Sequence, residues 1–187
     1  MLEYDFMQTA FEAGTVVAIV AGAVGYFLVL RNLAFAGHAL SHVGFAGATG
    51  AVLLGVLTLV LLTGIARPLV FATLDPELAE AKGVSLRLIA VLFLVIVAIA
   101  VAEAVQVVGI LLVFALMVGP AAAALRFTTR LKSGVALAIG LAVAETWLGI
   151  TLAYVTDWPP SFWITLVSSA VYGASFLPMM LPRAARV

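Results

Sequence analysis

Two histidines four positions apart are the residues of this chain most suited to bind a metal ion. His38 and His42 share one helix face because side chains at i and i+4 lie one turn apart. Neutral imidazoles bind zinc and other first-row divalent ions. The alternative is that both rings hydrogen-bond to neighbouring helices or water. An HxxxH pair does not decide between these roles, and no HExxH sequence accompanies it.

Two carboxylates lie inside long apolar stretches, at Glu103 and Glu145. An acidic charge at the centre of a bilayer costs about 2.5–3.5 kcal/mol on translocon-type scales, so such a group is paired, protonated or hydrated. Both residues are therefore weaker candidates for a metal pathway. A protonated packing role for Glu145, and contact of Glu103 with water outside the cell, remain equally open.

The composition predicts that the lipid bilayer surrounds most of the chain. Hydrophobic residues make up 65% of the 187 residues, charged residues make up 10%, and the mean hydropathy is +1.27. Soluble domains average about 25% charged residues, so a soluble fold would expose too much apolar surface. The absence of cysteine excludes disulfides and thiolate metal sites. No basic patch is present, and we expect no nucleic-acid partner.

The apolar segments predict the fold class. A transmembrane helix needs about 20 apolar residues to cross about 30 Å of hydrocarbon. Six segments meet or approach this length, at about 10–30, 36–62, 88–106, 108–125, 135–155 and 162–181. We expect a break near Gln106 to Gly109, because 88–125 is too long for one helix. The prediction is an all-α polytopic transmembrane helix bundle of five or six spans, forming one domain over residues 1–187.

Basic residues orient these spans, because Lys and Arg concentrate in cytoplasmic loops. The segment from Arg126 to Lys132 and the C-terminal Arg186 are expected inside the cell, and residues 157–160 outside. Arg31 also favours the inside, which places the acidic N-terminus outside.

The region between Arg31 and Arg67 is crowded. Both residues favour the cytoplasm, so an even number of crossings must separate them, yet only 35 residues lie between them. One helix of that length would measure about 52 Å, much longer than the bilayer is thick. Two helices would have about 17 residues each, which is the minimum for a span. The sequence leaves open whether this region crosses once or twice.

A short polar segment at 75–83 predicts a separate cytoplasmic helix. Asp75 suits the N-cap and Pro76 the first helical position. Glu77 adds favourable charge to the first turn, and Gly83 is a typical C-terminal stop. The segment is either a solvated connector or a docking helix for a cytoplasmic partner.

Four stretches of the chain resemble one protein family. They are Gly22 to Gly50 (GAVGYFLVLRNLAFAGHALSHVGFAGATG), Phe71 to Val84 (FATLDPELAEAKGV), Ala104 to Ala124 (AVQVVGILLVFALMVGPAAAA) and Ala153 to Thr165 (AYVTDWPPSFWIT). Together they resemble the membrane permease subunit of bacterial ATP-binding cassette importers for divalent metals, of the zinc/manganese/iron type. They are spread over residues 22–165 and follow the family's order.

The resemblance implies a multi-pass protein of the bacterial inner (plasma) membrane that forms the translocation pathway for zinc, manganese or iron. It implies no tightly bound cofactor and no enzymatic activity. No GxxxxGK[ST] sequence is present, so ATP hydrolysis belongs to a separate cytoplasmic ATPase. An extracytoplasmic metal-binding protein and a second permease copy are the other implied partners. The residues that would contact the ATPase are Asp75, Pro76, Glu77, Leu78, Glu80 and Gly83.

The resemblance also places the histidine pair in the metal pathway. The family has an acidic residue at the position of His38 and a histidine at that of His42. Replacing a carboxylate by an imidazole makes the site less negative and favours zinc over manganese, which prefers oxygen ligands.

The family carries additional spans that this chain lacks. Leu53 to Val56 runs almost directly into Leu57 to Phe71, which resembles the start of one family helix joined to the end of a later one. An internal deletion near residues 56–58 would produce this junction. Two alternatives to a working importer follow, namely a degenerate membrane subunit that no longer transports and an intramembrane metalloenzyme built on the HxxxH pair.

Overall fold

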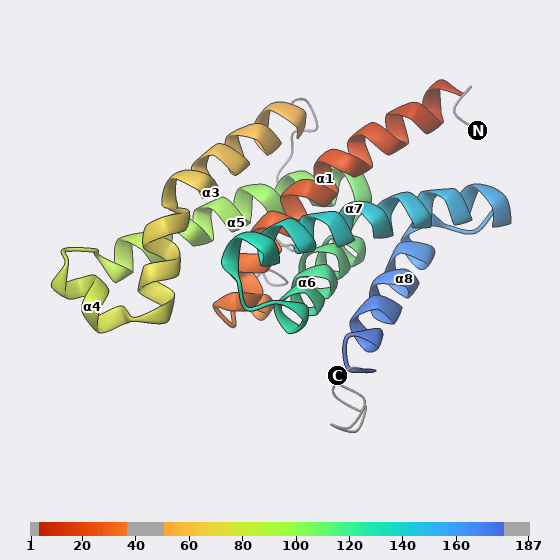
Figure 1. The fold of residues 1–187 in the computed structure, drawn as a ribbon. Coiled ribbons are helices and arrows are strands. Elements are labelled where there is room, and N and C mark those ends of the chain that lie inside the picture. Colours follow the sequence, from red (N-terminus) through yellow and green to blue (C-terminus); the bar gives the residue numbers. More distant parts are fainter. Residues whose placement is uncertain (1–3, 37–50, 178–187) are drawn as a thin grey trace.

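The described residues fold into helices alone, which confirms the prediction of an all-α bundle (Figure 1). The structure, a computed structural model, describes residues 4–36 and 51–177. The helices within this part of the chain are α1 (Asp5–Leu30), α3 (Ala51–Leu74), α4 (Pro76–Ala81), α5 (Leu86–Val108), α6 (Ile110–Phe127), α7 (Leu131–Thr156) and α8 (Pro160–Ala174).

Helix α1 lies in the middle of the bundle. Figure 1 shows α3 and α5 on one side of it and α6, α7 and α8 on the other, and α1 packs against α3, α5, α6 and α7. Glycines on α1 allow this position. A Cβ on Gly22 would lie 2.8 Å from the backbone Cα of Ile139 on α7. A Cβ on Gly25 would overlap the backbone carbonyl of Met117 on α6. Small residues at such crossings let membrane helices pack closely.

Helices α1 and α3 run in the same direction. Near one end, Gly55 of α3 lies beside Val16 and Val20 of α1. Near the other, the Arg31 guanidinium donates a hydrogen bond of 3.2 Å to the Thr73 hydroxyl. Helix α1 therefore ends, and α3 begins, at opposite ends of the bundle.

The helix that covers the second half of the expected 36–62 span continues well past residue 62. Within the described residues the helix runs from Ala51 to Leu74, past both Arg67 and Pro68. We expected the span to end near residue 62 and Arg67 to lie on the cytoplasmic side. The helix continues because neighbouring helices and local adjustment make proline tolerable inside membrane helices.

The other helices differ from the expected spans by a few residues. The first span begins at Asp5 instead of residue 10, and the break in the 88–125 stretch falls at Gly109, whose φ is +86°. Four helical segments of the described residues are long and apolar enough to cross a membrane: Asp5–Leu30, Leu54–Leu74, Leu86–Val105 and Leu131–Thr156. Helix α6 is apolar but shorter, and α8 ends at Ala174 instead of residue 181.

The packing around α1 predicts that Gly25→Ala destabilises the protein. The added methyl group has no room against the α6 backbone, and overpacking of this kind costs about 1–3 kcal/mol. Gly140→Ala on α7 is the matched control, because a Cβ there meets no atom within 4 Å. The measurement is the midpoint of thermal unfolding in detergent, followed by size-exclusion chromatography. Equal midpoints for the two variants would contradict the close approach of α1 to α6.

Candidate metal pathway and coupling helix

The two buried carboxyls lie on opposite sides of α1. His38 and His42, the strongest metal-ligand candidates of the sequence, lie outside the described residues. Among the residues that the structure describes, no three His, Asp or Glu side chains come together as a metal cluster. Glu103 and Glu145 are therefore separate features of the bundle.

Glu103 extends from α5 towards α3 and α1. Its side chain is 9% exposed, and its Oε1 atom has no hydrogen-bond partner. A Cβ on Gly55 of α3 would lie 4.0 Å from Glu103 Oε2 and 3.2 Å from a methyl group of Val16. The glycine thus leaves the space that the carboxyl occupies beside α1.

Thr58 adds a second unpartnered oxygen to this region. It lies three residues after Gly55 on the same face of α3, is fully buried, and its hydroxyl has no partner. Thr73 and Thr146, by contrast, donate to the carbonyls four residues earlier at 2.6 and 2.8 Å. Thr58 therefore offers an unpaired hydroxyl in the same layer as Glu103.

Glu145 lies where α7 meets α6 and α8. It is 1% exposed, and neither carboxyl oxygen has a hydrogen-bond partner. One turn further along α7, Gly149 packs on Ile164 of α8, at 2.9 Å from an added Cβ to the Ile164 amide nitrogen. Because consecutive helices joined by a tight turn run antiparallel, this register sets Glu145 opposite Ser168. The Ser168 hydroxyl donates instead to the Ala115 carbonyl of α6, at 3.3 Å.

Sequence reasoning found the two carboxyls but not the two hydroxyls beside them. An ionisable group in an apolar stretch is conspicuous because it is rare and costly in a membrane. Thr58 and Ser168 carry no such signal, since serine and threonine occur throughout membrane helices. Only the packing of α3 and α8 reveals them.

The short helix α4 connects α3 to α5 at the end of the bundle that carries Arg31. The Asp75 carboxylate accepts a hydrogen bond of 3.0 Å from the Leu78 amide, and Pro76 is the first helical residue. Gly83 has a φ of +82°, and the backbone there accommodates the turn into α5. The cap and the stop thus fall where the 75–83 pattern puts them.

One face of α4 is anchored and the other is free of the bundle. Ala79 is fully buried, whereas Glu77 and Glu80 are exposed and Leu78 is 45% exposed. Arg31 lies over the Phe93 ring of α5 at 5.8 Å. Burial lowers the pKa of its guanidinium, which stays charged at neutral pH. Glu77, Leu78 and Glu80 therefore form an acidic, partly apolar exposed face of α4, while the buried Ala79 holds the helix against the bundle.

Comparison with known proteins decides the family. The ABC 3 transport family matches residues 3–61 and 51–179. The chain belongs to the ABC 3 transport family. Members of this ABC transporter family are permease subunits, and the chain is accordingly a multi-pass bacterial membrane protein and not an enzyme. The metalloenzyme hypothesis is not favoured by this membership.

Relatives in the ABC 3 transport family carry manganese in their names. The manganese transport system membrane protein MntC of Halalkalibacterium halodurans is 25% identical, over 94% of this chain and 88% of that protein. The manganese import system permease protein ScaB of Streptococcus pneumoniae is 24% identical, over 93% and 91%. A similar fold is found in PsaBC from Streptococcus pneumoniae in complex with Fab, with a TM-score of 0.85, 21% identity and coverage of 94% and 92%.

The chain has fewer internal residues than its relatives. The alignment with MntC runs over 257 positions, which 187 residues cannot fill, so at least 70 positions of the alignment have no residue of this chain. The two family matches overlap at residues 51–61, within α3.

The capping geometry predicts that Asp75→Ala loosens α4. Loss of an N-cap costs about 1 kcal/mol, so the local opening equilibrium should rise about fivefold. Asp75→Asn is the control, because asparagine is an equally good N-cap. The measurement is hydrogen exchange of the backbone amides of residues 77–81. Unchanged exchange in Asp75→Ala would show that the cap does not hold the helix.

Proposed function

We propose that the chain is the membrane permease subunit of an ATP-driven importer of divalent metal ions, with manganese as the first candidate substrate. Membership in the ABC 3 transport family carries this proposal, together with the manganese transport named for MntC and ScaB. The partners are a cytoplasmic ATPase, an extracytoplasmic metal-binding protein and a second copy of the permease. Zinc and iron are the competing substrates.

The proposed pathway uses His38 and His42, with Glu103 and Glu145 as weaker contributors. Imidazoles suit zinc, copper and iron, whereas carboxylates suit manganese. A site built from the histidine pair alone would favour zinc, and a contribution from Glu103 with the Thr58 hydroxyl would favour manganese. The metal is a transported substrate and no resident cofactor is required.

The proposed contact with the ATPase is the exposed face of α4, with Asp75, Pro76, Glu77, Leu78, Glu80 and Gly83 as the contributing residues. Helix α4 is tied to α3 and α5, which both extend into the bundle beside α1. A force applied to α4 therefore acts on the helices that hold Glu103. ATP binding can shift the permease between two states only if the ATPase binds those states with different affinity.

A charge-reversal variant tests the docking surface. Glu77→Lys combined with Glu80→Lys should greatly reduce co-purification of the ATPase, because it replaces two exposed acidic groups by cations on the docking face. The control is Glu12→Lys, an exposed glutamate near the opposite end of the bundle. The measurement is the amount of ATPase retained on tagged permease in detergent. Full retention by the double variant at equal expression would contradict the role of α4.

A further inference from the structure

An unpartnered carboxyl and an open groove lie on the two sides of one serine. Glu145 is almost completely buried, and both of its oxygens lack a hydrogen-bond partner. Leaving a carboxylate unpaired among apolar helices is costly, whereas the protonated acid carries no net charge. The surroundings therefore favour the form of Glu145 that carries a proton.

No fixed cation near Glu145 can compensate a negative charge. In α1, α6, α7 and α8 as the structure describes them, the Lys and Arg residues are Arg126, near the end of α6, and Lys132, near the start of α7. The other titratable groups on these helices are Asp5, Glu12 and Tyr26 of α1, Tyr154 of α7 and Tyr172 of α8. Any charge on Glu145 would have to be stabilised by water.

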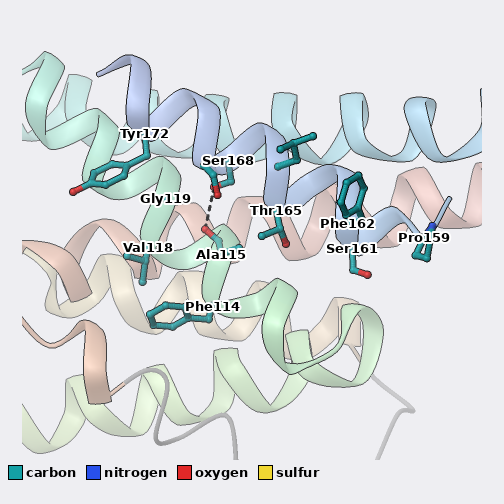
Figure 2. A pocket seen from close by; sticks show the side chains of 12 residues that line it. Phe114, Ala115, Val118, Gly119, Pro159, Ser161, Phe162, Thr165, Ser168 and Tyr172 are labelled. Atoms are coloured by element: carbon teal, nitrogen blue, oxygen red, sulfur yellow. Dashed lines mark hydrogen bonds between the residues drawn. The ribbon is translucent and has the colours of Figure 1, made fainter. Parts of the chain in front are cut away.

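A groove of about 770 Å³ runs between α6 and α8 (Figure 2). Apolar side chains such as Phe114 and Phe162 form much of its wall. Ser161, Thr165 and Ser168 also line it, at intervals of four and three residues along α8. This spacing sets three hydroxyls in a row on one helix face, starting at the Pro159 end. The groove therefore offers hydroxyl groups to water along an otherwise apolar wall.

Ser168 connects the groove to the carboxyl. It lines the groove, and it stands opposite Glu145 in the α7–α8 register. In Figure 2 its hydroxyl points at Ala115, the carbonyl to which it donates. Gly119 makes room for this arrangement, because a Cβ there would overlap the Ser168 hydroxyl. Rotation of one hydroxyl would therefore turn the Ser168 donor from α6 to Glu145.

We propose that Glu145 is a proton-binding site inside the membrane, which exchanges its proton with water in the α6–α8 groove through the Ser168 hydroxyl. On release, the Glu145 O–H bond breaks and Ser168 accepts that proton while passing its own to a groove water. The carboxylate that remains is stabilised by the Ser168 hydroxyl and by water that enters between α7 and α8. Protonation restores the dry contact between these helices.

Labelling with dicyclohexylcarbodiimide tests the proposal without measuring transport. This hydrophobic reagent modifies protonated carboxyls, and exposed glutamates are ionised at about pH 7 because their reference pKa is about 4. In membranes at neutral pH, Glu145 should acquire an adduct, detected by peptide mass spectrometry, whereas the exposed Glu77 should not. Glu145→Gln, which resembles the neutral acid in shape, should lose that adduct. An unmodified Glu145 in the folded protein, with modification only after unfolding, would overturn the proposal.

Two substitutions on α8 test the route through the groove. Thr165→Phe fills the groove and should slow labelling of Glu145 several-fold. Ala170→Phe is the control, because Ala170 is exposed on the same helix and does not line the groove. Equal labelling rates in the two variants would exclude the groove as the access path. Failure of either labelling test would leave the metal-import proposal untouched, since neither test involves a metal or the ATPase.

Discussion

The close approach of α1 to the backbones of α6 and α7 is the interaction on which the arrangement of the bundle depends. Lipid provides no hydrophobic drive for helix association, so packing and internal polar contacts must supply it. Gly22 and Gly25 allow α1 to touch two other backbones at once. With α1 in the centre, α3 and α5 pack on one side and α6, α7 and α8 on the other. Both buried carboxyls are positioned by this division.

Unpaired oxygens are the exception in this bundle, and they mark its functional candidates. Several helical threonines bond to their own backbone, as Thr73 and Thr146 do. Thr58, Glu103 and Glu145 retain buried oxygens without a partner. A membrane helix bundle can have such atoms where water, a proton or a cation occupies the site during function. Glu103 on α5 and Glu145 on α7 lie on different faces of α1, so they belong to separate sites.

Much of the fold could be predicted from hydropathy, because spans, breaks and caps follow local rules. Asp75 and Gly83 bound α4 as their chemistry requires, and Gly109 breaks the long 88–125 stretch. The extent of α3 could not be predicted, since Arg67 and Pro68 suggest an end where the helix continues. The roles of Thr58 and Ser168 depend on helix packing, which spacing along one chain does not encode. His38 and His42 stay predictions, because they lie outside the described residues.

We expect this shortened member of the ABC 3 transport family to import a divalent metal. The most direct measurement is uptake of radioactive manganese into proteoliposomes that contain the permease and its ATPase, oriented so that ATP is supplied on the α4 side. We expect accumulation that requires ATP hydrolysis, is competed by unlabelled manganese and is lost in His42→Ala. Manganese, zinc and iron uptake that never exceeds the level without ATP, in vesicles where the complex is intact, would contradict it and favour a subunit that no longer transports.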